Sequence, residues 1–143
     1  MNHWVGNYQH SIDTKGRLFL PAKHREGLSE NVYMTRGLGG CIFLFPEQEW
    51  FDFIDELGKM NFSEALSAQR YFAGNAGQSE IDSQGRIIIP QNLRKFASLE
   101  KDVTIVGLGN RFEIWDSETW ENRNNEITND KVSEILSNMN FKL

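Results

Sequence analysis

Residues 13–17 (DTKGR) and 82–86 (DSQGR) are the segments best placed for chemistry, because each puts an aspartate four residues before an arginine. Neither segment pairs a nucleophile with a general base, so bond-making catalysis is not predicted. A guanidinium held by a carboxylate can instead present paired donors to a phosphate or to guanine. The alternative is an ion pair that only stabilises a turn and contributes at most about 1 kcal/mol.

The two segments belong to a longer internal repeat with an offset of 82 − 13 = 69 residues. At this offset IDTKGRLFLPAKHR lies on IDSQGRIIIPQNLR, with identical Asp, Gly, Arg and Pro positions. With a short gap the register continues from NVYMTRGLGGCIFLFPEQEW to DVTIVGLGNRFEIWDSETW, which pairs Trp50 with Trp120. An internal duplication on this scale indicates two copies of one structural unit.

Each copy is predicted to begin with a short strand, a tight turn and an apolar return strand, which together form a β-hairpin. Asp suits the first position of a type I turn and Gly supplies a positive φ. Pro21 and Pro90 end the return strands because proline has no N–H for a ladder. The expected segments are a strand at 8–12 and a basic helix at about 22–28 in the first copy, and 78–81 and 91–98 in the second.

Two more strands and a helix are predicted in each copy. The strands VYMTRG and CIFLF, like VTIVG and RFEIW, are joined by glycine-containing turns, so GLGGC is interpreted as a hairpin turn rather than a phosphate-binding loop. A helix with Trp50 on its apolar face follows Pro46, and Asp116 or Ser117 caps its counterpart. A connecting helix runs from a Ser63 cap to Gly74. A final amphipathic helix near the C-terminus must dock on the body or on a neighbouring subunit.

Acidic and basic side chains are unevenly distributed. The formal net charge of −5 on its own disfavours a polyanionic partner. Residues 1–28 nevertheless hold four Lys and Arg against two Asp and Glu, a balance of 4 − 2 = +2, and residues 81–101 repeat it. Basic charge therefore follows the two turns. The candidate binding residues are Asp13, Lys15, Arg17, Lys23, Arg25, Asp82, Arg86 and Arg94, although the helix cations also fit an ordinary solvated helix face.

Signals for metal, redox or membrane chemistry are lacking. Cys41 lies in the apolar run CIFLF and is predicted to be a buried structural residue. His3, His10 and His24 have no metal-ligand spacing, so no metal or cofactor is expected. No apolar stretch approaches the roughly 18 residues of a membrane span, and the first residues do not read as a signal peptide. We therefore expect a cytoplasmic protein with no membrane partner and no enzyme activity.

Two copies of D-x-x-G-R, each followed by an apolar strand, a proline and a basic helix, closely resemble the MraZ family over about residues 6–120. The resemblance implies an α+β, mainly β fold with two tandem SpoVT-AbrB domains. In it, swapped-hairpin units form one pseudo-twofold barrel with flanking helices. The implied boundaries are 7–49 for domain 1, 50–75 for connecting helices, 76–119 for domain 2 and 120–143 for a C-terminal helical tail.

The resemblance also implies a function. Members of this family are sequence-specific DNA-binding transcriptional regulators of the division and cell-wall gene cluster, associated with the nucleoid. They bind promoter direct repeats as ring-shaped homo-oligomers, and their D-x-x-x-R signature maps here onto Asp13 with Arg17 and Asp82 with Arg86. Trp4 departs from the family pattern. Gln84 replaces Lys15 in the second turn, so the first turn is predicted to contact DNA more strongly.

An AbrB-type antitoxin that pairs with a toxin through its tail is the alternative function. The tandem duplication disfavours it, because antitoxins of this type usually carry one copy and a disordered toxin-binding extension. Co-purification of a stoichiometric partner would favour it.

Overall fold

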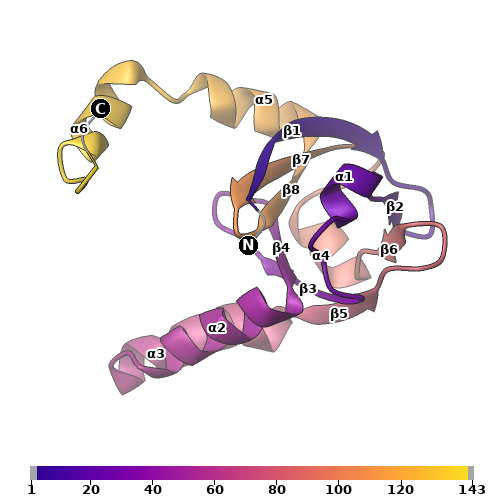
Figure 1. Cartoon of the computed structure of the whole chain (residues 1–143), viewed down its shortest axis with the longest axis horizontal. Coiled ribbons are helices and arrows are strands. Elements are labelled where there is room, and N and C mark those ends of the chain that lie inside the picture. Colours follow the sequence, from indigo (N-terminus) through magenta and orange to yellow (C-terminus); the bar gives the residue numbers. More distant parts are fainter. Residues whose placement is uncertain (1–2, 142–143) are drawn as a thin grey trace.

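Antiparallel strands and short helices alternate in the computed structural model, which describes residues 3–141 (Figure 1). The strands are β1 (Trp4–Ser11), β2 (Arg17–Phe19), β3 (Asn31–Arg36), β4 (Ile42–Pro46), β5 (Gly77–Glu80), β6 (Arg86–Ile88), β7 (Asp102–Gly109) and β8 (Phe112–Asp116). The helices are α1 (Ala22–Arg25), α2 (Glu47–Gly58), α3 (Phe62–Phe72), α4 (Gln91–Phe96), α5 (Ser117–Asn125) and α6 (Asn129–Leu136), with a 3-10 turn η1 (Ala73–Asn75). The expected α+β, mainly β class is confirmed.

The strands of the described residues form two sheets. One is a six-stranded antiparallel sheet with the order β1-β7-β8-β4-β3-β5, and the other is a two-stranded ribbon of β2 and β6. The described strands do not close into a barrel, so that part of the expectation is wrong. The reason is that β2 and β6, only three residues each, hydrogen-bond to each other rather than joining the open edges of the larger sheet.

Strand pairing crosses between the two copies of the repeat. β1 of the first copy pairs with β7 of the second over eight residues, and β5 of the second copy pairs with β3 of the first. The predicted β3–β4 and β7–β8 hairpins are confirmed. The predicted hairpin of β1 with β2 is not, because a single bridge between Ile12 and Leu18 joins them. β2 pairs with β6 instead, which lets both strands bury one face in a common core.

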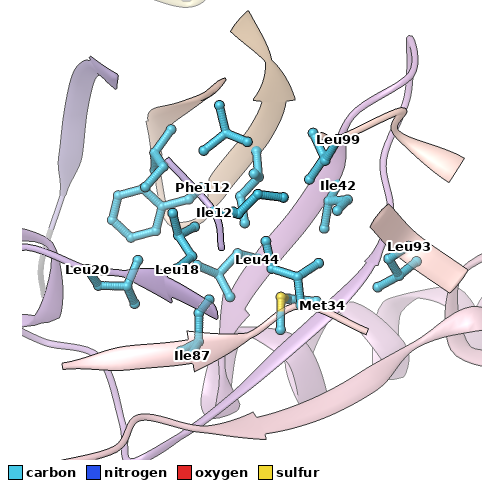
Figure 2. Packing of buried hydrophobic residues seen from close by; sticks show 14 of the residues in the cluster. Ile12, Leu18, Leu20, Met34, Ile42, Leu44, Ile87, Leu93, Leu99 and Phe112 are labelled. Carbon is cyan, nitrogen blue, oxygen red and sulfur yellow. The ribbon is translucent and has the colours of Figure 1, made fainter. Parts of the chain in front are cut away.

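The main core is built from both copies (Figure 2). Leu18 and Leu44 from the first copy and Ile87 and Phe112 from the second are 0–1% exposed and lie in the same cluster. Burial of each such side chain contributes roughly 1.5–3 kcal/mol. Because neither copy encloses this core alone, the two copies stabilise each other.

The helices begin where the prolines and caps predict, with one exception. α1 and α4 follow Pro21 and Pro90 directly, although they are shorter than expected. Asp116 caps α5 by accepting a hydrogen bond from the Thr119 N–H at 3.1 Å. The predicted Ser63 cap of α3 is wrong: Asn61 is the cap, and its Oδ1 accepts from the Ser63 N–H at 3.1 Å. Asn serves well as an N-cap, so the helix starts before the serine.

An aromatic cluster lies between the large sheet and α2. Trp50 and Trp115 are 5–6% exposed, and Trp50 stacks on Tyr33 with ring centroids 5.5 Å apart. Trp120 packs against the same cluster as a partly buried residue, and Trp50 lies on the apolar face of its helix as predicted. Cys41 is fully buried beside them, and burial raises the pKa of its thiol, as expected of a structural cysteine.

The C-terminal helix does not dock on the body of the chain. α5 starts beside the sheet, whereas α6 lies away from it in Figure 1, and Val132 and Ile135 on α6 are 39% and 58% exposed. Residues 142–143 of the expected tail lie outside the described residues. Within residues 3–141, none of the helices combines the length and the apolar character needed to cross a bilayer.

His24 of α1 occupies a buried position that Leu93 of α4 fills in the second copy. The His24 ring is 2% exposed and lies against Tyr8 and Phe112, with centroid distances of 4.2 and 5.3 Å. Neither of its nitrogens has a hydrogen-bond partner among the described residues. Burial lowers the pKa of His24, and the nearby His10 and Lys23 lower it further.

Replacing His24 with Leu should raise the free energy of unfolding near pH 7.5 by up to about 1 kcal/mol. Relief of the unpartnered polar group, about 1–3 kcal/mol, outweighs the lost aromatic contacts, about 0.5–1.5 kcal/mol. The folded chain binds the His24 proton less readily than the unfolded chain does. The free energy of unfolding is therefore highest above the ordinary histidine pKa of 6.5, and it falls as the pH drops below that value. His24→Leu should flatten that fall, leaving the part due to His10, whose pKa burial also lowers.

Urea unfolding of both proteins near pH 7.5 and near pH 5.5 measures this difference. A variant as acid-sensitive as the wild type would contradict the assignment to His24.

Candidate nucleic-acid interface

Asp13 organises the first turn with both carboxylate oxygens. Its Oδ1 accepts from the backbone N–H groups of Lys15 and Arg17 at 2.9 and 3.0 Å, and its Oδ2 accepts from Arg17 Nε at 2.5 Å. The Gly16 N–H closes the turn onto the Asp13 carbonyl at 3.0 Å. The carboxylate thus fixes both the backbone of the turn and the orientation of the arginine.

The second turn repeats this geometry with Asp82. Its Oδ1 accepts from the N–H groups of Gln84 and Arg86 at 2.9 Å each, and its Oδ2 accepts from Arg86 Nε at 2.9 Å. In both turns the aspartate contacts the guanidinium group of its arginine only at Nε. Among residues 3–141 no hydrogen-bond acceptor contacts the Nη groups of Arg17 or Arg86, so those terminal donors are free for a ligand.

These hydrogen bonds hold both carboxylates in the ionised form. The backbone N–H of Arg17, followed by its guanidinium, lowers the pKa of Asp13 from 3.8 to about 2. The backbone N–H of Arg86 is likewise the main cause of the lowered pKa of Asp82. At neutral pH each aspartate therefore remains an acceptor that keeps its arginine in place.

Each turn is braced by an arginine from the opposite copy. A Cβ on Gly16 would lie 2.7 Å from the guanidinium carbon of Arg94, and a Cβ on Gly85 would lie 2.8 Å from that of Arg25. Both glycines have φ near +80°. The Nε atoms of Arg25 and Arg94 donate to the carbonyls of Leu20 and Ile89, the residues that directly follow β2 and β6. Arg25 and Arg94 thus lie at the turns, next to Asp82 with Arg86 and Asp13 with Arg17 respectively.

The ribbon of β2 and β6 carries the turn arginines on its outer face. Leu18 and Ile87 point into the core, so the residues that alternate with them point outward. Arg17 lies opposite Ile88, and Phe19 lies opposite Arg86. Figure 1 places this ribbon at the end of the molecule away from α2, α3, α5 and α6.

The two turns differ in charge. Residues 11–17 hold Asp13, Lys15 and Arg17, a balance of 2 − 1 = +1, whereas residues 80–86 hold Glu80, Asp82 and Arg86, a balance of 1 − 2 = −1.

Lys23 is the one candidate binding residue that the structure places away from the turns, among the residues it describes. Its Nζ lies 5.3 Å from the centre of the Tyr8 ring on β1. Within residues 3–141 no three His, Cys, Asp or Glu side chains are arranged to hold a metal ion.

Comparison with known proteins matches this duplicated architecture. A family profile described as "MraZ protein, putative antitoxin-like" matches residues 4–70 and again 72–140. The chain belongs to the MraZ family. Proteins named "Transcriptional regulator MraZ" are similar to it over most of their length. The relative from Heliobacterium modesticaldum is 48% identical and covers 85% of this chain and 86% of its own.

Other MraZ proteins agree over longer alignments. The relative from Lachnoclostridium phytofermentans is 42% identical over 95% of this chain and 94% of its own, and the one from Pelotomaculum thermopropionicum is 40% identical over 96% and 98%. The resemblance noted from the D-x-x-G-R repeats is therefore confirmed as MraZ membership.

Sequence reasoning missed two residues of this MraZ surface. Phe19 and Ile88 are 47% and 56% exposed on the outer face of the ribbon, beside the turn arginines. The signal was present, because a period of two in RLFL and RIII places these side chains on the face of the arginine when the flanking apolar residues are buried. Phe19 and Ile88 were not predicted as surface residues because the return strands were treated as uniformly apolar.

Proposed function

We propose that this chain is a sequence-specific DNA-binding transcriptional regulator, without enzyme activity or cofactor, of the division and cell-wall gene cluster. The observation that carries the proposal is the outward ribbon on which Asp13 and Asp82 hold Arg17 and Arg86 by Nε alone. A two-stranded ribbon fits the major groove, where a guanidinium can donate two hydrogen bonds to guanine O6 and N7.

The remaining cations supply contacts without sequence information. Lys15 at the exposed tip of the first turn is suited to a phosphate, and so are the guanidinium groups of Arg25 and Arg94 beside the turns. Lys23, over Tyr8, reaches a more distant phosphate if it contacts DNA at all. The first turn, with its balance of +1 against −1, contributes more of the affinity than the second.

Assembly into a ring-shaped homo-oligomer on promoter direct repeats completes the proposal. One chain offers few phosphate contacts, and arrayed copies that meet repeated boxes convert weak contacts into avidity. The crossing of strands between residues 7–49 and 76–119 supports a tandem SpoVT-AbrB arrangement of the swapped-hairpin type. A cytoplasmic, nucleoid-associated location follows from this function.

The experiment that tests the proposal is a mobility-shift titration with the DNA upstream of the protein's own gene. We expect a shift that an unrelated duplex of equal length does not compete away. The logarithm of the binding constant should fall with the logarithm of salt concentration at a slope near −0.9 for each phosphate neutralised. Light scattering on the same sample reports the oligomer. A flat salt response would overturn the assignment of the basic residues to DNA.

The antitoxin alternative has one supporting observation. The apolar side chains Val132 and Ile135 on α6 are exposed and could be covered by a toxin. Purification from the native host with a stoichiometric second protein that α6 truncation releases would favour this alternative over the regulator that acts alone.

A further inference from the structure

We propose that Phe19 and Ile88 are specificity-determining residues that contact thymine methyl groups beside the bases read by the turn arginines. This inference rests on the proposed DNA binding. It assigns the two apolar residues on the outer face of the ribbon, which neither the repeat signature nor the family description covers.

The first step is the geometry of the ribbon face. Arg17 faces Ile88 across the ladder and Phe19 faces Arg86, so cations and apolar groups alternate in a checkerboard of four residues. Opposite side chains in such a pair lie about 4.5–5.5 Å apart at Cβ. A base pair that receives a guanidinium on this face therefore has an apolar side chain of the partner strand directly beside it.

The second step is exposure. Phe19 and Ile88 are 47% and 56% exposed although their neighbours Leu18 and Ile87 are 0% and 1% exposed. A single exposed apolar side chain is ordinary, but two on one ribbon face beside the arginines are typical of a surface that a partner covers. In the major groove the apolar group available for that contact is the C5 methyl of thymine.

The third step separates the two residues. The guanidinium of Arg25 lies 5.7 Å from the Phe19 ring centre, which holds the ring in place by a cation–π contact. Ile88 is smaller, and Arg94, the counterpart of Arg25, has no aromatic ring at that position. The two ends of the ribbon thus present different apolar side chains to the DNA, and Phe19 presents the larger apolar surface.

The experiment replaces thymine with deoxyuracil, one position at a time, in the upstream duplex that the mobility shift uses. Deoxyuracil lacks only the methyl group, so its effect isolates the apolar contact. For the wild type, we expect about a three- to fivefold loss of affinity at each contacted thymine, the amount that burial of one methyl group contributes. The variant Phe19→Ala should bind the thymine and uracil duplexes equally at the positions that Phe19 contacts, and Ile88→Ala at the others.

Phe62→Ala is the matched control, because Phe62 is 80% exposed at the start of α3, away from the ribbon. It should keep the full thymine preference. Tight binding by the wild type without any thymine preference would overturn this inference and leave the proposed function standing. Retention of the thymine preference by both ribbon variants would also overturn the inference alone. Dissociation of the oligomer in Phe19→Ala would overturn it too, because it would place Phe19 between subunits. Failure of the wild type to bind either duplex would instead overturn DNA binding itself.

Discussion

Replacing Arg17 with Ala should weaken binding to the repeat-containing duplex by about 100-fold or more while the oligomer stays intact. One bidentate contact to guanine contributes about 1–3 kcal/mol, and the loss multiplies when several copies in a ring engage the DNA together. The Arg17 side chain is 35% exposed, and its only side-chain partner among the described residues is Asp13. Its removal therefore leaves the core and the strand pairing unchanged.

Two matched variants make this result specific. Arg123→Ala removes an exposed arginine on α5 that pairs with Glu126 at 3.8 Å, and it should leave affinity unchanged. Arg86→Ala should cost less than Arg17→Ala, because Glu80 and Gln84 make the second turn less positive than the first. Titration by fluorescence anisotropy, with light scattering as the check on assembly, measures all three. An Arg17→Ala protein with wild-type affinity would refute the role of the first turn.

Replacing Gly107 with Ala should lower the free energy of unfolding by about 3 kcal/mol. Gly107 lies in β7 opposite Gly6 of β1, and an added Cβ would lie 2.7 Å from the backbone carbon of Trp4 and from the nitrogen of Val5. These are backbone atoms of a paired strand and cannot rotate away. β1 must shift, so the ladder that joins the two copies weakens, at a cost typical of severe overpacking.

Gly58→Ala supplies the control for this measurement. Gly58 is the last residue of α2, and an added Cβ there meets no atom within 4 Å. Alanine at that position should leave stability unchanged or raise it by up to about 1 kcal/mol through helix propensity. Urea denaturation of the two variants beside the wild type decides the matter. Equal midpoints for Gly107→Ala and the wild type would mean that β1 does not lie on β7 in solution.

Local patterns in the sequence predicted most of the elements. The prolines after β2 and β6 and the acidic cap of α5 fixed where helices begin, and the glycine turns fixed the β3–β4 and β7–β8 hairpins. The pairing of β1 with β7 and of β2 with β6 was not predictable in the same way. A strand with one apolar face accepts any partner that buries it, so local preference favoured the nearest strand along the chain.

The candidate site was predictable only in part for a similar reason. The spacing of Asp13 and Arg17 is enough to predict a turn with a held guanidinium, and the structure has that geometry. The contact of Arg94 with Gly16 joins residues from different copies, and nothing in the local sequence marks it. Phe19 needed knowledge of which face of β2 is buried, which follows from the core and not from the strand itself.

The crossed bracing of the turns limits how the duplicated halves can diverge. Arg94 fills the space that Gly16 leaves open, and Arg25 fills the space that Gly85 leaves open, so a larger residue at either turn would displace an arginine of the other copy. Those four positions are identical between the copies, whereas the exposed tip carries Lys15 in one and Gln84 in the other. The crossed bracing thus keeps the geometry of the two turns alike, while the exposed positions around it are free to differ between the copies.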